Sequence, residues 1–183
     1  MAHFLKKIEL LQPFRNIQPF TLKFKDGINI IVGENGSGKS SILYLLTNVS
    51  KELEKIRKIT TDPVTYKFLD TEKENPRIKG NLDYSKNFEF TVASRFISHG
   101  ETMIKLLSAS KDFKDNLLII DEPEAGLSIH NQYKILKIYE DLVNKHNCQC
   151  VITTHSYIII KSVNTIFSMD VKKWIIPKTY LKI

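Results

Sequence analysis

Three short runs of apolar and β-branched residues open the chain. They cover Phe4–Leu11, Phe20–Phe24 and Ile28–Val32, and they are separated by Pro13, Pro19 and Asp26-Gly27. Short runs of this kind, bounded by proline and glycine, are typical of β-strands. We therefore expect three β-strands at the N-terminus, the last of them at Ile28–Val32.

A helical pattern follows this strand. After Ser40, apolar residues recur every three or four positions, at Ile42, Leu43, Leu45, Leu46, Val49, Leu53 and Ile56. The spacing predicts one helix of about four turns, which Asp62-Pro63 brings to an end. Residues 70–87 are polar and mixed in charge, so we expect the most variable part of the chain there. A short alternating strand is predicted at Phe88, Phe90 and Val92.

The C-terminal half alternates strands with a helix. Leu117–Ile120 is wholly apolar, Asn131–Lys145 has helical periodicity, and Val151–Thr153 is a second apolar run. Apolar strands that alternate with helices predict a mostly parallel sheet that is covered on both faces. The expected fold class is therefore α/β, with a mostly parallel sheet flanked by helices.

The strand Ile28–Val32 and the predicted helix are joined by Gly33-Glu34-Asn35-Gly36-Ser37-Gly38-Lys39-Ser40. This is a phosphate-binding loop in the context that the motif requires, with a strand before it and a helix after it. Its glycines let backbone N–H groups point inward, and the N-terminal end of the helix adds positive potential. We expect Lys39 to bind the β- and γ-phosphates of ATP and Ser40 to ligate Mg²⁺. The candidate nucleotide-binding residues are Gly33, Glu34, Asn35, Gly36, Ser37, Gly38, Lys39, Ser40 and Ser41.

A second candidate element is the apolar run Leu117–Ile120 with the two acids that follow it. Beside the strand Ile28–Val32, this run would bring Asp121 next to the Mg²⁺ ion. Glu122 is one residue further and turned to the other side, so we predict it to be the catalytic base that activates water for attack on the γ-phosphate. Such a run can also be a strand that leads into a helix cap, and its pairing with the phosphate-binding loop favours the catalytic interpretation.

In this order, the motifs resemble those of ATP-binding-cassette (ABC) ATPases. The similarity is to the soluble branch of this family, which includes RecF-like, SMC-like and OLD-like proteins. This chain resembles a small stand-alone form that is also grouped with the AAA ATPases. Three further segments carry the resemblance. Ser98-His99-Gly100-Glu101 is similar to the cassette signature, Pro123–Ser128 to the loop that touches the other subunit, and Thr153–Ser156 to the segment that holds the switch histidine, His155. Phe14-Arg15-Asn16 resembles a segment that soluble cassettes use near the nucleotide.

The resemblance implies a mechanism in outline. Two cassettes face each other head to tail, and each ATP lies between the phosphate-binding loop of one chain and the signature of the other. ATP binding would close a homodimer, and hydrolysis to ADP and phosphate would release it. The chain's own site would use Lys39, Ser40, Asp121, Glu122 and His155, with Arg15 touching phosphate, while Ser98 and Gly100 would complete the site of the second copy.

The same resemblance implies how the chain is organised. Residues 1–183 would form a single ABC-type ATPase domain with a P-loop NTPase fold, in which residues 57–97 are a variable insert between the loop helix and the signature. The domain would have an N-terminal antiparallel β portion and a reduced helical subdomain that carries the signature. The cofactors would be ATP and Mg²⁺, and the enzyme an ATPase.

Departures from the family pattern bear on the biological role. Transporter cassettes place a Gln between the loop helix and the signature, whereas no Gln occurs from Ser41 to Asn131. Only 57 residues separate Ser40 and Ser98, which leaves no room for the coiled coil of SMC-like proteins. We therefore favour an ATP-dependent switch or clamp in DNA repair, recombination or phage-related defence, acting on double-stranded DNA or a partner effector protein. The alternatives are a regulatory ATPase that binds a protein and no nucleic acid, and the nucleotide-binding subunit of a membrane transporter.

Charge and composition further limit the kinds of partner and the cellular location that we expect. The 183 residues have a formal net charge of +7, and the excess lies in residues 1–27 and 161–183. If these ends meet, they would form a patch suited to a phosphate backbone, although a solvated lysine-rich surface has the same composition. No run approaches the roughly 20 apolar residues that span a bilayer, and two cysteines, Cys148 and Cys150, make no disulfide framework. We expect a cytoplasmic protein without membrane insertion, with both cysteines as buried thiols.

Overall fold

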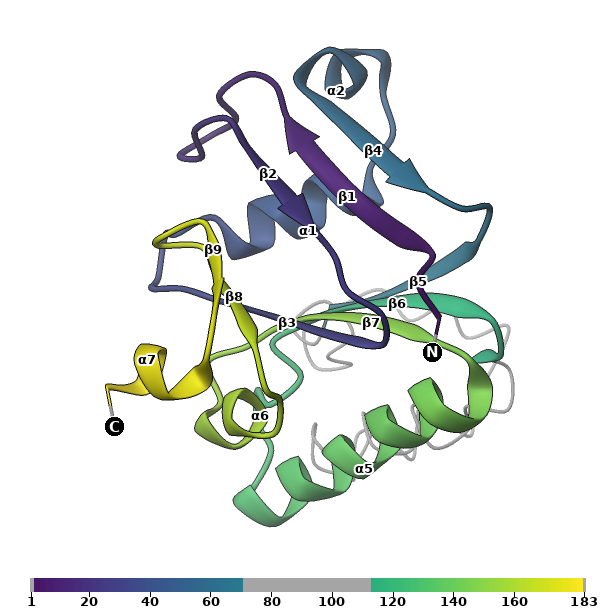
Figure 1. Cartoon of the computed structure of the whole chain (residues 1–183), viewed down its shortest axis with the longest axis vertical. Coiled ribbons are helices and arrows are strands. Elements are labelled where there is room, and N and C mark those ends of the chain that lie inside the picture. Colours follow the sequence, from purple (N-terminus) through teal and green to yellow (C-terminus); the bar gives the residue numbers. More distant parts are fainter. Residues whose placement is uncertain (1, 71–112, 183) are drawn as a thin grey trace, which may run out of the picture.

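Two β-sheets of unequal size organise the protein (Figure 1). The computed structural model describes residues 2–70 and 113–182. The smaller sheet is antiparallel and has the strand order β2-β1-β4, where β1 is Leu5–Leu10, β2 is Phe20–Lys23 and β4 is Arg57–Thr61. The larger sheet has the order β5-β6-β7-β3-β8-β9 and is parallel except between β8 and β9. Its strands are β3 (Ile28–Val32), β5 (Thr65–Asp70), β6 (Asn116–Asp121), β7 (Gln149–Thr153), β8 (Ile166–Ser168) and β9 (Lys173–Ile175).

Helices cover both faces of the larger sheet (Figure 1). Helix α1 (Lys39–Thr47) lies on the side of the smaller sheet, and α2 (Lys51–Ile56) follows it and leads into β4. Helices α5 (Ile129–His146) and α6 (Tyr157–Lys161) cover the opposite face, and α7 (Pro177–Leu181) packs beside α6. The predicted α/β class, with a mainly parallel sheet and an antiparallel N-terminal portion, is confirmed.

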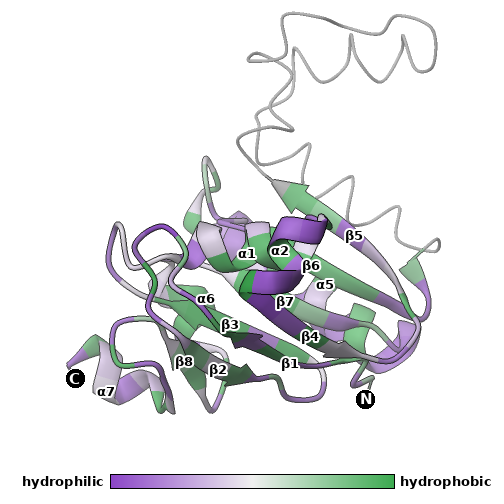
Figure 2. Cartoon of the chain, turned by 90° about the horizontal axis from the view of Figure 1, so that it is seen from above, coloured by the Kyte–Doolittle hydropathy of each residue, from purple (hydrophilic) through white to green (hydrophobic). Residues whose placement is uncertain are grey.

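Strand β6 shows why the central strands are apolar throughout. Leu117 and Ile119 belong to the cluster that fills the space around α1 and the smaller sheet. Leu118 and Ile120 point to the other side and join the cluster under α5. A strand that is buried on both faces needs apolar residues at every position, because successive side chains alternate between the faces. Figure 2 shows the hydrophobic residues of β5 and β6 side by side.

The helix after the phosphate-binding loop is shorter than the sequence predicted. A single helix to Ile56 was expected, but α1 ends at Thr47 and a separate helix, α2, begins at Lys51. Asn48 is extended, and the hydroxyl of Ser50 caps α2 by accepting from the backbone N–H of Leu53 at 3.2 Å. Asn and Ser compete with a continuous helix because their side chains bond to the nearby backbone. The prediction of one four-turn helix is therefore wrong.

Two strands lie where the sequence analysis placed no regular element. β4 pairs with β1 through Ile8 and Ile59, and β5 pairs with β6 through Phe68 and Ile119. β4 is an edge strand with a single apolar side chain, Ile59, so it has no visible period of two. Residues 57–61 and 65–70 of the expected insert are thus part of the two sheets. The strand expected at 88–92 lies outside the described residues.

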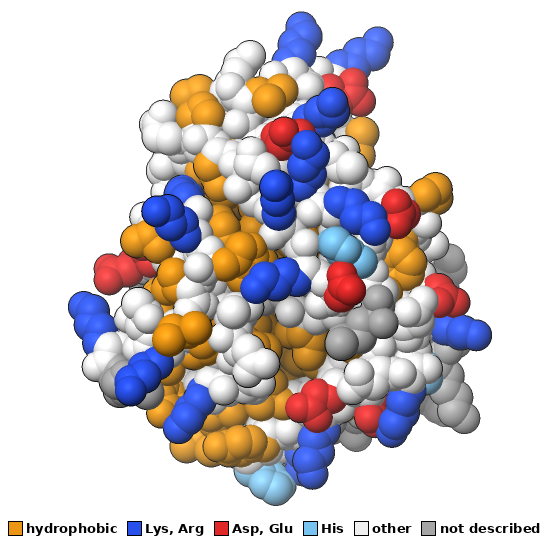
Figure 3. Space-filling view, in the orientation of Figure 1, with side chains coloured by type: hydrophobic (Ala, Val, Ile, Leu, Met, Phe, Trp, Pro, Cys, Tyr) orange, Lys and Arg blue, Asp and Glu red, His pale blue; other side chains and the backbone are white. Residues whose placement is uncertain are grey.

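The two basic ends of the chain meet at the edge of the smaller sheet. The indole N–H of Trp174 donates to the carbonyl of Lys23 at 2.9 Å, and the ammonium of Lys25 lies 4.3 Å from the centre of the Trp174 ring. Lys172 lies 4.9 Å from the centre of the Phe20 ring. Figure 3 shows lysine and arginine side chains over the smaller sheet on this face of the molecule. Contact between the ends, which the charge distribution left open, is therefore a feature of the fold.

Two further observations concern membrane spans and the cysteines. Within residues 2–70 and 113–182, no helix has the length and apolar character needed to cross a bilayer. Cys148 and Cys150 are buried and not joined in a disulfide. Burial raises the pKa of both thiols, which keeps them uncharged at neutral pH.

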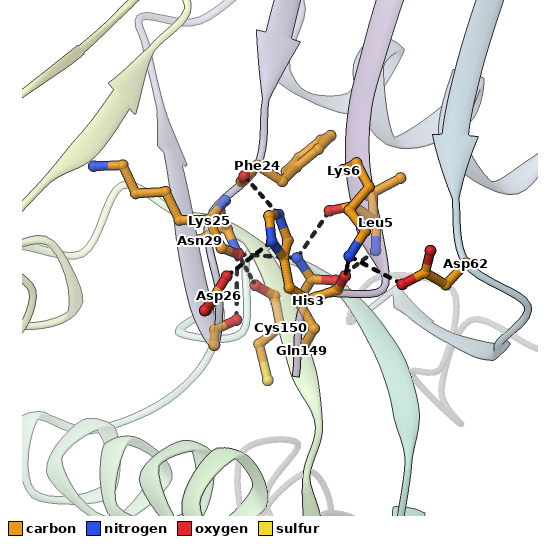
Figure 4. Close-up of polar contacts among 11 residues, drawn as sticks. His3, Leu5, Lys6, Phe24, Lys25, Asp26, Asn29, Asp62, Gln149 and Cys150 are labelled. Atoms are coloured by element: carbon orange, nitrogen blue, oxygen red, sulfur yellow. Dashed lines mark hydrogen bonds and ion pairs between the residues drawn. The ribbon is translucent and has the colours of Figure 1, made fainter. Parts of the chain in front are cut away.

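Two buried amide side chains tie the sheets together (Figure 4). Gln149 on β7 accepts from the backbone N–H of Leu5 at 2.7 Å, and it donates to the carbonyls of Leu5 and Lys25 at 3.0 and 2.9 Å. Asn29 on β3 accepts from the N–H of Lys25 at 2.7 Å and donates to its carbonyl at 2.8 Å. Both side chains are fully buried, so these bonds pair amide groups that water does not reach.

We expect Gln149→Met to lower the free energy of unfolding by about 2–4 kcal/mol. Methionine fills a similar volume, but it leaves the buried N–H and carbonyl of Leu5 without their side-chain partner. Urea unfolding of this variant is the measurement, with Gln18→Met as the control because Gln18 is exposed. Equal stability of the two variants would contradict the role of Gln149 in joining the sheets.

Candidate functional site

The candidate residues gather at one edge of the larger sheet. Parallel strands end at the same edge, and the segments that follow β3, β6 and β7 begin with Gly33, Glu122 and Thr154. Ligand sites of open α/β sheets lie at this carboxyl edge. The phosphate-binding loop, the two acids and His155 come together here, although up to 122 residues of chain separate them.

The phosphate-binding loop needs glycine at two of its positions for different reasons. Gly36 has φ +79°, a left-handed conformation that side chains other than glycine rarely adopt. Gly38 has φ +99°, and a Cβ atom there would lie 2.5 Å from Cγ1 of Ile17. Gly38 is also the N-cap residue of α1, whose first residue is Lys39. The close packing on Ile17 holds the loop against the N-terminal segment.

Lys39 is buried at the centre of the site. Its ammonium group donates to the carbonyls of Gly33 and Glu34 at 3.0 and 3.3 Å, so the side chain folds back under the loop. Burial lowers the pKa of Lys39, and the carboxylates of Glu122 and Asp121 act against that shift. The arrangement places one cation between the loop that binds phosphate and the two acids.

A hollow lies beside the phosphate-binding loop. It is lined by Asn16, Asn35, Gly36, Gly38, Lys39, Ser40, Ser41 and Glu122. Most of these residues belong to the predicted set. Asn16 was not predicted as a site residue, although it stands next to Arg15; its amide donates to the carbonyl of Gly36.

Arg15 lies against the start of α1. Its guanidinium group lies 5.1 Å from the ring centre of Phe14 and 4.7 Å from that of Tyr44, and the two rings are stacked on each other. One guanidinium nitrogen approaches the hydroxyl of Ser41 at 3.5 Å. The aromatic contacts fix the cation beside the helix end that follows the loop.

The two acids stand at a sharp turn of the chain. Asp121 ends β6 and accepts a hydrogen bond from the hydroxyl of Thr153. Glu122 has φ +44°, which is uncommon for a residue with a side chain. Its backbone N–H donates to the carbonyl of Thr153 at 3.1 Å, so the neighbouring strand β7 holds this conformation. Backbone strain of this kind concentrates at functional sites.

Glu122 and His155 face each other across the site. Nε2 of His155 lies 3.5 Å from Oε1 of Glu122, and both side chains are partly exposed. Burial raises the pKa of Glu122, while His155 acts to lower it. A carboxylate with a raised pKa is a stronger base than an ordinary glutamate, which suits a group that takes a proton from water.

The oxygen donors at the site suit a magnesium ion that a nucleotide helps to hold. Ser40 has an exposed hydroxyl and Asp121 has a carboxylate at the same edge of the sheet. Among residues 2–70 and 113–182, no group of three or more His, Cys, Asp and Glu side chains could enclose a metal by itself. Mg²⁺ commonly takes one or two protein oxygens together with water and substrate phosphates. The residues present therefore fit this ion and not an all-protein metal cage.

Glu124 fixes the segment that carries the switch histidine. Its Oε1 accepts from the backbone N–H groups of His155 and Ser156, at 2.6 and 3.0 Å. Gln132 on α5 adds to this contact, because its side-chain oxygen accepts from the hydroxyl of Ser156 at 2.6 Å. The sequence analysis assigned no role to Glu124 or Gln132, since nothing in the local pattern shows a bond that spans about 30 residues. Ser98 and Gly100, the predicted signature residues, lie outside the described residues.

Comparison with known proteins identifies the family. The model of the AAA ATPase domain family matches residues 4–108 and 94–160, which is most of the chain. The chain belongs to this family and has the fold of an ABC-type P-loop ATPase domain. The resemblance to cassette ATPases that the motifs indicated is therefore confirmed.

Sequence relatives come from two kinds of protein. The zinc import ATP-binding protein ZnuC of Ehrlichia canis is 24% identical over 165 residues, which covers 78% of this chain and 68% of the relative. The DNA replication and repair protein RecF of Francisella tularensis subsp. mediasiatica is 35% identical over 96 residues. That match covers 42% of this chain and 28% of RecF.

Solved structures of both kinds share the fold. cbiO1 from Clostridium perfringens, part of the ABC transporter complex cbiONQ, superposes with a TM-score of 0.69 at 14% identity and covers 98% of this chain and 92% of its own. The SMC head domain from Thermotoga maritima gives a TM-score of 0.60 at 16% identity, with 91% and 94% covered. At these identities the likeness establishes the fold alone.

We expect Glu124→Ala to lower the free energy of unfolding by about 1–2 kcal/mol and to speed amide exchange at His155 and Ser156. The substitution removes the charged acceptor of both N–H groups. Urea unfolding and hydrogen exchange resolved by residue are the measurements, and Glu140→Ala on the exposed side of α5 is the control. Unchanged exchange at the two amides would show that Glu124 does not hold this segment.

Proposed function

We propose that the protein binds and hydrolyses ATP and that ATP controls its assembly into a dimer. The observation that carries the proposal is the convergence of Lys39, Asp121, Glu122 and His155 at the carboxyl edge of one sheet. A cation, a metal-binding carboxylate and a base beside a histidine are the groups that phosphoryl transfer to water requires. In this proposal residues 1–183 act as one ATPase domain.

Each described group has one task in the proposed reaction. The loop N–H groups and Lys39 hold the phosphates and offset their charge as it develops. Glu122 accepts a proton from the attacking water, and His155, 3.5 Å away, orients that carboxylate and the terminal phosphate. Ser40 and Asp121 would hold Mg²⁺, which supplies positive charge at the β- and γ-phosphates when bound.

The site is open on one side, which supports its completion by a second copy. The hollow beside the loop faces outward, and Gly126 and Ser128, in the segment that resembles the subunit-contacting loop, are exposed. In a head-to-tail homodimer, Ser98 and Gly100 of one copy would close the ATP site of the other. The free energy of ATP binding would then favour the closed dimer over separate chains.

The favoured role is an ATP-dependent switch or clamp in DNA repair, recombination or phage-related defence. The RecF relative supports this role, as do the basic residues of the two chain ends that meet beside the smaller sheet. Double-stranded DNA is the partner that we favour.

A second candidate is the nucleotide-binding subunit of a membrane transporter. The ZnuC relatives favour it, since their matches cover more of this chain than the RecF match does. The lack of a Gln between Ser41 and Asn131 opposes it, because that residue couples a transporter cassette to its membrane partner in the family pattern.

We expect Glu122→Gln to bind MgATP normally and to hydrolyse it about 10²–10⁴-fold more slowly, because glutamine keeps the shape of the side chain but takes up no proton. Single-turnover hydrolysis is the first measurement. Light scattering in saturating MgATP is the second, since a variant that cannot hydrolyse ATP should accumulate as a dimer. A variant that stays monomeric would contradict the ATP-controlled dimer, and a wild-type rate would contradict the role of Glu122.

Steady-state ATP hydrolysis with and without linear double-stranded DNA, at two salt concentrations, tests the role. We expect DNA to stimulate hydrolysis and the stimulation to fade at higher salt, because phosphate contacts release counterions. Hydrolysis that does not respond to DNA would instead favour a protein partner. Stable co-purification with a membrane protein would favour the transporter subunit.

A further inference from the structure

A second hollow lies beside the hollow at the phosphate-binding loop, and a residue near the end of the chain lines it. It is lined by Glu34, Asn35, Glu122, His155 and Tyr180. Asn35 and Glu122 also line the first hollow, so the two hollows are neighbours. The proposed base and the switch histidine therefore share one space with Tyr180, and neither the motifs nor the family resemblance points to that tyrosine.

The fold holds the C-terminal segment firmly against the phosphate-binding loop. After β8, the N–H of Met169 donates to the carbonyl of Val32 at 2.8 Å, and the carboxylate of Asp170 accepts from the N–H of Glu34 at 3.2 Å. Tyr180 itself lies on α7 and packs, with Leu181, against the apolar cluster that includes α5 and α6. In Figure 1, α7 lies below the turn between β3 and α1, at the same end of the larger sheet.

Tyr180 is a neutral hydrogen-bond donor in this position. Burial raises the pKa of its phenol, the carboxylates of Asp170 and Glu34 add to the increase, and the backbone N–H of Gly33 acts against it. The hydroxyl therefore keeps its proton at neutral pH. The same hollow contains the carboxylates of Glu34 and Glu122, which repel a phosphate group. A phosphate that enters it needs donors, and Tyr180 supplies one beside Asn35 and His155.

We propose that Tyr180 is a nucleotide-positioning residue whose O–H group donates to the terminal phosphate of ATP. The inference rests on the proposed function and adds a group to the same site. The terminal phosphate is the part of the nucleotide concerned, because Glu122 and His155 in the same hollow act at the γ-phosphate in the proposed reaction. ADP lacks this phosphate and gains nothing from the hydroxyl. Segment 169–181 is thereby a wall of the ATP site.

Tyr180→Phe tests the proposal, since it removes the hydroxyl and keeps the ring that packs under the sheet. We expect the affinity for MgATP to fall about tenfold and that for MgADP to stay as in the wild type, because a hydrogen bond to a charged phosphate is lost only with ATP. Isothermal titration calorimetry with each nucleotide is the measurement. Tyr133→Phe is the matched control, because Tyr133 is an exposed tyrosine on α5.

Several results would overturn the inference, and they are distinguishable. If Tyr180→Phe binds both nucleotides as the wild type does, Tyr180 has no such role and the proposed function stands. Equal weakening of ATP and ADP together with a lower unfolding midpoint would assign Tyr180 to packing alone. If the wild type binds neither nucleotide, the proposed function fails and this inference fails with it.

Discussion

The register of three parallel strands is the constraint on which the site depends. Thr153 of β7 pairs with Ile31 of β3 on one side and with Asp121 of β6 on the other. These three residues therefore lie in one row across the sheet, and the segments that follow β3, β6 and β7 begin at the same edge of the sheet. A shift of one residue in either pair would turn every side chain of that strand to the opposite face. Because these strands are apolar on both faces, burial alone would tolerate such a shift. The buried hydrogen bonds of Gln149 and Asn29 and the bond between Thr153 and Asp121 oppose it, so polar contacts also fix the site.

The smaller sheet depends on the same strands through polar contacts. Gln149 and Asn29 stand on β7 and β3, and their amides bond to the backbone of Leu5 and Lys25. Fully buried amides are costly unless every donor and acceptor is paired, so these bonds select one position of the smaller sheet. That position places Ile17 against Gly38 and Asn16 against Gly36. Packing far from the phosphates thus determines the shape of the loop that would bind them.

The parts of the fold that sequence could predict are those with local signals. A few consecutive residues are enough to predict each of these parts. They are the phosphate-binding loop, the acids after β6 and the strands β1, β3, β6 and β7. The sequence did not predict the break after α1, because the helical spacing of apolar residues continues through Asn48 and Ser50, which end one helix and begin the next. The sequence did not predict β4, because an edge strand with one apolar residue shows no alternation of apolar and polar positions.

The contacts that sequence could not predict join distant segments. Glu124 accepts hydrogen bonds from the backbone N–H groups of residues 155 and 156. Almost every residue has such an N–H group, so the sequence does not show which of them a side chain will bind. Tyr180 reaches the site only because β8 and β9 return the chain to the loop. Asn16 was within a segment that the resemblance singled out, yet only the fold shows that its amide meets Gly36. Residue type indicated the chemistry of the site, and tertiary structure decided which residues share it.

Charge balance at the site connects the proposed chemistry with the choice of cofactor. Asp121, Glu122, Glu124 and Asp170 all act on Lys39, so carboxylates outnumber the buried cation. A triphosphate adds further negative charge to this region, and its repulsion with the acids increases as water leaves the site. A divalent cation, which Ser40 and Asp121 would hold, would offset part of that charge. On the proposed function, the nucleotide would therefore enter as its magnesium complex. Burial, and to a lesser extent the neighbouring acids, makes Glu122 a stronger base, and those acids also favour a bound cation.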